Sequence, residues 1–388
     1  MAESDPKPKV EYKQYESGNI LLSLSYVFLF ALWGLSYFIL IPVSFNLIAS
    51  SSLIIFIGSH RSLKLEGGTD GADGQSGAEA KSEKKETISK EDAYKFPLVG
   101  SAALFSLYIA FKFFDKDIVN LILSFYFSVI GVFTLTNTLA PFMSQFIPSP
   151  KKYGKKFNLP YIGEIDTEVT LAEIISLIPS IIFAIFYFKT KHYILNNVLG
   201  ISFCVQAIEK ISLGSYKVGA ILLVGLFFYD IFWVFGTEVM VTVAKSFDGP
   251  IKLLFPRVLP TVDTKGEFSL LGLGDIVIPG LFVALLLRLD ARLAHVNPYK
   301  SEYLAFPKPY FLVNMISYAL GLVATVMVMY YFKAAQPALL YLVPACLGGS
   351  LLVGLIRGEI TYLFAYEEDD GKTEGKVAVK STESKKTD

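Results

Sequence analysis

The stretch ILLVGLFFYDIFWVFG, residues 221–236, places one aspartate, Asp230, inside a continuous apolar run. A run of this composition is typical of a helix that crosses about 30 Å of hydrocarbon. A charged group at that depth costs about 2.5–3.5 kcal/mol on insertion scales, and such groups usually mark functional sites. Asp230 is therefore a candidate functional residue. A single membrane aspartate can equally bond a neighbouring helix or line an ion path.

The rest of the chain has the composition of a membrane protein. Of its 388 residues, 53% are hydrophobic and 18% are charged, and the mean hydropathy is +0.49. The apolar residues run in continuous blocks of about 20 rather than alternating, which favours membrane-spanning helices over a transmembrane β-barrel. We therefore predict an all-α polytopic membrane protein with about nine transmembrane helices. The net charge of +0 gives no indication of a nucleic-acid partner.

The apolar blocks locate the expected spans. Residues 20–57 are apolar almost without a break, but Pro42, Ser44 and Asn46 interrupt them, so this region predicts either one span or two. The later blocks lie at 97–114, 117–143, 169–188, 192–209, 216–243, 268–288, 309–332 and 336–356. Between them, residues 60–95 predict a flexible charged loop, 144–168 a basic loop, and 244–267 a loop of medium length.

The distribution of basic residues predicts the orientation, because cytosolic loops carry an excess of Lys and Arg. In a nine-span arrangement, the alternate loops at 60–95, 144–168, 210–217 and 288–308 hold nearly twice as many basic residues as the opposite loops. This predicts a cytosolic C-terminus. In this arrangement the lysines before residue 16 lie on the side opposite the cytosol, against the rule, so the charge distribution does not decide on which side the N-terminus lies.

A second aspartate, Asp275, lies in FSLLGLGDIVIPGLFVALLL, residues 268–287, and we expect it seven residues into the next span. Consecutive spans are antiparallel, so the spans of Asp230 and Asp275 both end at the loop between them. The two carboxyls are therefore expected at similar depth. Gly272 and Gly274 precede Asp275, and small residues let helices approach closely and let the backbone bend.

Two carboxyls a few ångströms apart in an apolar setting share one proton. The ionised member can deprotonate a water molecule while the protonated member polarises a peptide carbonyl. This chemistry requires no metal ion, and we expect no metal or other cofactor. The sequence contains no HExxH, and Cys204 and Cys346 are separate residues within apolar blocks rather than part of a CxxC motif.

A third feature is AAQPALLYLVPAC, residues 334–346, which opens the last expected span. Pro337 removes a backbone donor and restricts Gln336, so the freed carbonyls and Ala338 can offer an extended surface. Proline is also common at the first position of helices that have no functional role there.

Together these three pieces resemble the GxGD-type intramembrane aspartyl proteases, a presenilin-like class. Within that class the chain is similar to the signal peptide peptidase family over about residues 90–366. The matching residues are Tyr229, Asp230, Gly272, Leu273, Gly274, Asp275, Pro337, Ala338 and Leu339. The resemblance implies nine spans and catalytic roles for Asp230 and Asp275. It further implies motif or substrate-positioning roles for Tyr229, Gly272, Gly274, Pro337, Ala338 and Leu339.

The resemblance implies an aspartic endopeptidase that cleaves signal-peptide remnants and similar type II transmembrane segments within the endoplasmic reticulum membrane. Presenilins have the opposite orientation, which the charge distribution disfavours. Lys385 and Lys386 resemble a dilysine retrieval signal, which agrees with a cytosolic tail in that membrane. The expected partners are transmembrane peptide substrates and the lipid bilayer. A homo-oligomer and membrane-protein degradation partners are compatible with the resemblance.

We accordingly expect five regions along the chain. They are a polar N-terminal segment at 1–19, N-terminal span or spans with a flexible charged loop at 20–95, an N-terminal transmembrane bundle at 96–209, the catalytic transmembrane region at 210–366 and a disordered cytosolic tail at 367–388.

The rival class is a non-enzyme, either an ion- or proton-coupled transporter or a scaffold for membrane-protein degradation. Transporters also use intramembrane carboxylates, but they usually show an inverted internal repeat, and none is evident. The other polar residues in the spans predict interhelical hydrogen bonds. They include Asn137, Asn196, Gln206 and Glu209.

Overall fold

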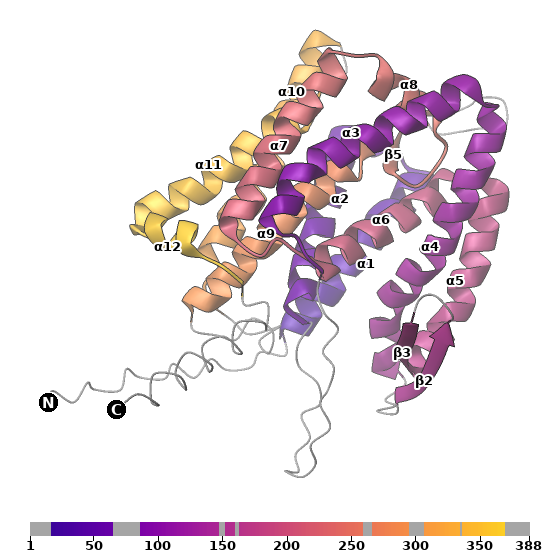
Figure 1. Cartoon of the computed structure of the whole chain (residues 1–388), viewed down its shortest axis with the longest axis horizontal. Coiled ribbons are helices and arrows are strands. Elements are labelled where there is room, and N and C mark those ends of the chain that lie inside the picture. Colours follow the sequence, from indigo (N-terminus) through magenta and orange to yellow (C-terminus); the bar gives the residue numbers. More distant parts are fainter. Residues whose placement is uncertain are drawn as a thin grey trace, which may run out of the picture.

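The computed structural model describes residues 17–64, 86–146, 152–159, 163–258, 266–294, 306–333 and 336–368. Its helices are α1 (Ser17–Phe38), α2 (Val43–Arg61), α3 (Lys90–Phe113), α4 (Lys116–Phe146), α5 (Leu171–Thr190), α6 (Tyr193–Lys210), α7 (Tyr216–Phe235), α8 (Val239–Ser246), α9 (Gly274–Leu293), α10 (Pro309–Phe332), α11 (Leu339–Arg357) and α12 (Ile360–Ala365), with a 3-10 turn at Ser62–Lys64 (Figure 1). The strands are β1 (Glu86–Thr87), β2 (Lys152–Leu159), β3 (Gly163–Thr170), β4 (Ile211–Ser212), β5 (Lys252–Val258) and β6 (Glu267–Gly272). The predicted N-terminal segment, most of the loop at 60–95 and the tail with Lys385 and Lys386 lie outside the described residues.

Most of the long helices can cross a membrane. Within the described ranges, seven are long and apolar enough by length and composition: α2, α3, α4, α5, α7, α10 and α11. Of the others, α6 has 18 residues and α9 has 20, but both carry more polar residues. The predicted all-α polytopic class is confirmed, and the number of nine spans stays a prediction compatible with these helices.

The apolar region at 20–57 forms two helices rather than one. Helix α1 ends at Phe38 and α2 begins at Val43, with Pro42 as its N-cap residue. Pro42 has no backbone N–H to donate into a continuous helix, which explains the break. Across the break, the Asn46 side chain donates a hydrogen bond of 2.8 Å to Ser36 Oγ.

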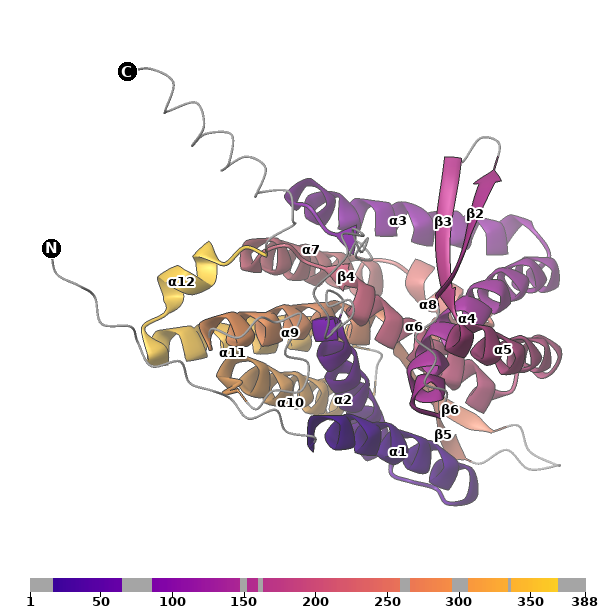
Figure 2. The ribbon, with the colours of Figure 1, turned by 90° about the horizontal axis from the view of Figure 1, so that it is seen from below.

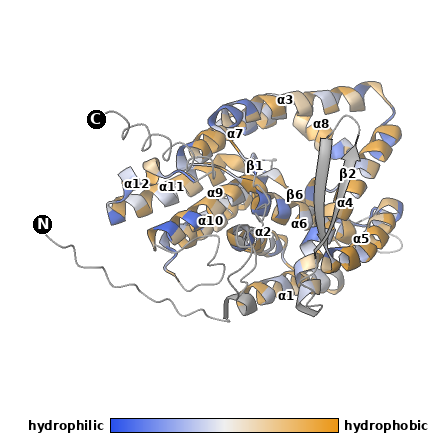
Figure 3. Cartoon of the chain, turned by 60° about the horizontal axis from the view of Figure 1, so that its bottom comes forward, coloured by the Kyte–Doolittle hydropathy of each residue, from blue (hydrophilic) through white to orange (hydrophobic). Residues whose placement is uncertain are grey.

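The outer helices present apolar side chains to their surroundings. On α3, α4 and α5, residues such as Leu98, Ile122 and Ile182 are more than half exposed. Figure 3 shows hydrophobic residues along the length of these helices. In water such a surface would be unstable, so these faces are the ones that contact lipid.

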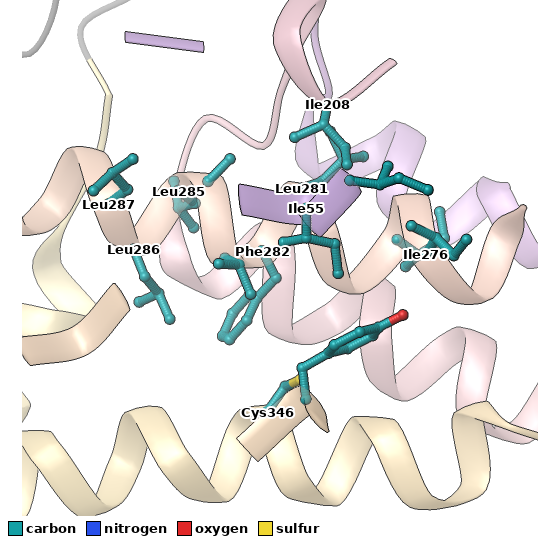
Figure 4. Close-up of a cluster of buried hydrophobic side chains, with 14 of the residues drawn as sticks. Ile55, Ile208, Ile276, Leu281, Phe282, Leu285, Leu286, Leu287 and Cys346 are labelled. Atoms are coloured by element: carbon teal, nitrogen blue, oxygen red, sulfur yellow. The ribbon is translucent and has the colours of Figure 1, made fainter. Parts of the chain in front are cut away.

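Helix α9 lies at the centre of the fold. Its residues 281–287 are almost fully buried, and it contacts α2, α6, α7, α10 and α11. Figure 4 shows part of this core, where Ile55 of α2 and Ile208 of α6 lie against Leu281 and Phe282. Gly280 makes the close packing of α2, α6 and α9 feasible, because a Cβ there would meet Ile208 Cδ1 at 2.5 Å and Ile55 Cγ1 at 3.3 Å.

Gly280→Val is therefore expected to destabilise the protein by about 1–3 kcal/mol, since the added methyl groups must displace both isoleucines. The measurement is the thermal unfolding midpoint in detergent. Gly348→Val is the matched control, because nothing lies within 4 Å of a Cβ at Gly348 in α11. Equal midpoints for the two variants would contradict this packing.

Three segments differ from the sequence expectation. The basic loop at 144–168 contains the antiparallel hairpin of β2 and β3. The apolar block at 216–243 is interrupted, because α7 ends at Phe235 and the short helix α8 follows. The block at 268–288 begins as β6, which pairs antiparallel with β5, and becomes helical only at Gly274. A short apolar run does not by itself distinguish a strand from a helix.

The end of α9 remote from β6 is tied to the last described residues. Arg288 forms a buried ion pair with Glu368 and donates a hydrogen bond of 2.9 Å to Ser62 Oγ. The Glu368 N–H in turn donates to Gly214 O at 2.7 Å. In the view of Figure 2, helix α12, which comes just before Glu368 in the chain, lies on the opposite side of the molecule from the β5–β6 hairpin.

Candidate active site

Asp230 lies near the end of α7 and is 4% exposed. The last helical residue, Phe235, comes five positions after Asp230, so Asp230 lies roughly 7 Å from the helix end. Asp230 is therefore closer to the end of its helix than the predicted span at 216–243 would place it, because α7 ends at Phe235. The Asp230 Oδ2 accepts a hydrogen bond of 3.1 Å from the Leu339 N–H.

Asp275 lies in the first turn of α9, one residue after its start at Gly274. It is not seven residues into a span, as the sequence suggested, because β6 occupies the residues before Gly272. The Gly272 N–H donates a hydrogen bond to the Asp275 carboxyl. Tyr318 Oη donates to the Asp275 carbonyl at 3.3 Å. The first turn of a helix also favours a negative charge through its free N–H groups.

The two carboxyl groups belong to one region of the molecule. Helices α7 and α9 are in contact, and both aspartates lie at the helix ends that the 236–273 connection joins. Asp275 lies close enough to Asp230 for the charge of one to act on the other. The predicted similar depth of the two side chains agrees with this geometry, although each helix ends or begins at a different residue than expected.

The third motif opens α11 beside Asp230. Pro337, Ala338 and Leu339 are buried, and Ala338 is the N-cap residue of the helix. The first N–H groups of a helix have no partner within it. One of these, the Leu339 N–H, binds Asp230, so the structure brings the Pro337–Leu339 motif and the first aspartate together.

The remaining motif residues have different surroundings. A Cβ on Gly272 would lie 3.2 Å from Asp275 Oδ2, so this glycine gives the carboxyl room. Nothing lies within 4 Å of a Cβ at Gly274, so no close packing there requires a glycine. Tyr229 is partly buried and its ring contacts Gly100 of α3, where a Cβ would be 3.6 Å away.

Sequence reasoning missed several polar residues around this region. Tyr318 is fully buried in α10, and nothing in its apolar span distinguishes it from a packing residue. Asn196 makes the expected bond to another helix, since its side chain accepts from Tyr187 Oη of α5 at 3.5 Å, and it also donates to the Lys252 carbonyl of β5 at 2.8 Å. Glu209 does join two helices, through an ion pair of 2.8 Å with Arg61 of α2.

A hollow of about 600 Å³ lies between the end of α7 and α8. It begins one turn beyond Asp230. Its lining residues are Val234, Phe235, Gly236, Thr237, Glu238, Val241, Thr242 and Lys245. Within the part of the chain that the structure describes, no three His, Cys, Asp or Glu side chains gather as metal ligands would.

The fold and this pair of acids define a polytopic helical membrane protein with a candidate carboxylate pair between adjacent spans. The family model described as signal peptide peptidase matches residues 80–370. The chain is 41% identical over 353 residues to the signal peptide peptidase of Homo sapiens, covering 88% of each chain, and 42% identical over 335 residues to that of Mus musculus, covering 84% of this chain and 83% of the relative. It is also 38% identical over 311 residues to a probable intramembrane protease of Schizosaccharomyces pombe, covering 79% of this chain and 93% of the relative.

The chain belongs to the signal peptide peptidase family and is an intramembrane protease.

Proposed function

We propose that this protease is an aspartic endopeptidase in which Asp230 and Asp275 activate a water molecule. The observation that carries the proposal is the proximity of the two acids on α7 and α9. The Leu339 N–H on Asp230 and the Gly272 N–H on Asp275 support it, since each hydrogen bond fixes the orientation of one carboxyl.

The two carboxyls act as one acid–base unit. With one proton between them, the ionised member takes a proton from water as the oxygen attacks the peptide carbon, and the protonated member donates to the carbonyl oxygen. The tetrahedral intermediate collapses when the departing nitrogen receives a proton. Because coupled acids titrate as a pair, the roles belong to the dyad rather than to fixed members of it.

The substrate must be partly unwound before cleavage. Every backbone amide of a transmembrane helix is bonded within that helix, which hides the bond to be cleaved. An unwound segment can add as a strand to an exposed sheet edge. We place that segment beside β6, which leads directly into Gly272 and Asp275, with the Pro337–Leu339 stretch as the alternative surface.

The proposed substrates are signal-peptide remnants and similar type II transmembrane segments in the endoplasmic reticulum membrane, with the C-terminus of the enzyme in the cytosol. The names of the relatives, the charge distribution and the Lys385–Lys386 pair support this location. A homo-oligomer and membrane-protein degradation partners remain part of this proposal.

The test is to incubate the purified full chain in proteoliposomes with a type II transmembrane peptide and to determine the product masses. The proposal predicts two fragments produced by a single hydrolysis within the apolar segment. Flux of an ion that depends on Asp230, with no peptide cleavage, would instead support the transporter alternative and contradict the proposal.

Helix-breaking residues in the substrate should accelerate cleavage. Each glycine that replaces an alanine near the cleaved bond lowers the stability of the substrate helix by about 1 kcal/mol, so we expect kcat/KM to rise roughly fivefold per substitution. The measurement compares peptides that differ only at that residue, with the same substitution near the peptide end as control. Equal rates for all peptides would show that unwinding does not limit cleavage.

A further inference from the structure

One face of α6 holds strand β5 through side-chain amides. Asn196 Nδ2 donates to the Lys252 carbonyl at 2.8 Å. Asn197 Nδ2 donates to the Leu254 carbonyl, and Asn197 Oδ1 accepts from the Leu254 N–H, both at 2.8 Å. Asn197 is 1% exposed, so neither bond competes with bulk water.

The pair of bonds from Asn197 reproduces what a neighbouring strand would provide. A side-chain amide carries the same donor and acceptor as a peptide group, and Asn197 uses both on one residue of β5. In an antiparallel sheet, two facing residues exchange the same two bonds. The edge of β5 away from β6 is therefore closed at Leu254 by α6.

Close contact between α6 and β5 supports this arrangement. A Cβ on Gly200 would lie 2.9 Å from Leu253 Cδ2 and 3.3 Å from Leu273 Cδ2. Gly200 lies one turn after Asn196 and Asn197, so all three residues face the hairpin. A residue larger than glycine at position 200 would have to displace the side chains of Leu253 and Leu273.

A third asparagine holds the chain just before β5. Asn120 of α4 donates to the Ser246 carbonyl at 2.9 Å and accepts from the Asp248 N–H at 3.0 Å. Lys252 Nζ donates to the Ala244 and Phe247 carbonyls, at 2.6 and 2.9 Å. The connection from α8 into β5 is thus held by Asn120 of α4 and by Lys252 of β5 itself. Burial lowers the pKa of the Lys252 ammonium.

The register of β5 sets the position of the candidate catalytic acid. Leu253 pairs with Leu271, and Lys252 pairs with Gly272, whose N–H binds Asp275. Leu273 N–H donates to the Ile251 carbonyl at 3.0 Å, which joins the start of α9 to the same strand. A slip of one residue between the strands would turn every side chain of β6 to the other face and would displace Gly272.

We infer that Asn197, assisted by Asn196, is a positioning residue that fixes the β5–β6 hairpin and thereby selects which substrate bond reaches the two aspartates. This inference rests on the proposed function, because it assigns β6 as the strand beside the substrate. With β5 closed by α6, the sheet offers an incoming strand only the outer edge of β6. Asn197 thus determines both the edge and the register that the substrate meets.

The experiment compares wild type, Asn197→Leu and Asn197→Ala with the control Asn314→Leu, in proteoliposomes containing one transmembrane peptide. Asn314 is also a fully buried asparagine, and its amide donates to the Cys346 carbonyl at 3.0 Å, away from the hairpin. Leucine has the same branching and the same number of side-chain heavy atoms as asparagine, so Asn197→Leu removes the two hydrogen bonds without leaving a cavity.

For the Asn197 variants we expect product masses that correspond to cleavage one or more residues away from the wild-type bond. We also expect kcat to fall by at least about tenfold, with a smaller change in KM. Asn314→Leu should lose stability but retain the wild-type product masses. Unchanged masses and kcat in folded Asn197 variants would overturn the inference. A wild type that fails to cleave the peptide would instead refute the proposed function.

A second measurement covers the case in which the Asn197 variants do not fold. Hydrogen exchange of the wild-type protein should show the Leu254 amide protected at a level comparable with the α9 core, because its N–H is bonded to a buried side chain. The milder variant Asn196→Ala loses the bonds of Asn196 to Lys252, Tyr187 and Asn197 but leaves both bonds between Asn197 and Leu254 in place. It should retain its fold and broaden the set of cleaved bonds. Rapid exchange at Leu254, or a single unchanged product set for Asn196→Ala, would contradict the positioning role.

Discussion

Asp230→Asn and Asp275→Asn are each expected to reduce kcat for transmembrane peptides by at least about 10²–10⁴-fold. An asparagine side chain preserves the size of the carboxyl but can neither take a proton from water nor return one. Because the two acids work as a unit, the double variant should be little worse than either single one. The measurement is the rate of product formation in detergent for variants shown to be folded.

Asp290→Asn is the matched control for this prediction. Asp290 is another buried aspartate on α9, 15 residues after Asp275, where it accepts hydrogen bonds from the N–H groups of Tyr310 and Phe311 at the start of α10. Its role is structural, so the variant should lose stability and keep kcat once folded. Full activity in Asp230→Asn or Asp275→Asn would eliminate the proposed mechanism.

Glu368→Ala is expected to lower the free energy of unfolding by about 3–5 kcal/mol. The change breaks the buried ion pair between Glu368 and the Arg288 guanidinium at the end of α9, and removing one member of a buried pair is strongly unfavourable. It also removes the contact between Glu368 and Ser212 beside the pair of β1 and β4. The measurement is the thermal unfolding midpoint in detergent.

Two truncations separate Glu368 from the rest of the tail. A chain that ends at Gly371 keeps Glu368 and should unfold at the wild-type temperature. One that ends at Tyr366 should lose at least as much stability as Glu368→Ala, because it also lacks the bond from the Glu368 N–H to Gly214 O. Both lack Lys385 and Lys386, so any change in cellular location affects them equally. Equal stability of the two truncated chains would show that the Arg288–Glu368 pair does not hold α9.

The sequence predicted the class of fold and the region of the candidate site well. Blocks of apolar residues long enough to cross a bilayer have few structural alternatives, because backbone groups in lipid must bond within their own helix. The prediction that 221–236 and the residues after Gly274 form neighbouring spans depended on this constraint. The sequence singled out Pro337 and Ala338 as a third feature, and the resemblance added Leu339, whose contact with Asp230 no spacing rule would have indicated.

The details between the spans were not predictable from periodicity. The residues at 268–272 are apolar like the helix that follows, and they form a strand because β5 offers a partner and α6 offers amides. The bond from Asn196 to the Lys252 carbonyl was missed for the same reason, since β5 had not been recognised. Helix ends depend on such local partners, so the positions of Asp230 and Asp275 within their helices differ from the expectation although their similar depth was expected.

The central claim is that Asp230 and Asp275 act together on one reacting group. The most direct test is the affinity of a peptide mimic that carries a hydroxyl in place of the cleaved bond, because such a group resembles the tetrahedral intermediate and binds between the two acids. We predict that wild type binds it tightly, that Asp230→Asn and Asp275→Asn each weaken binding by at least about 10²-fold, and that Asp290→Asn does not. Unchanged affinity in either Asp230→Asn or Asp275→Asn would contradict the claim.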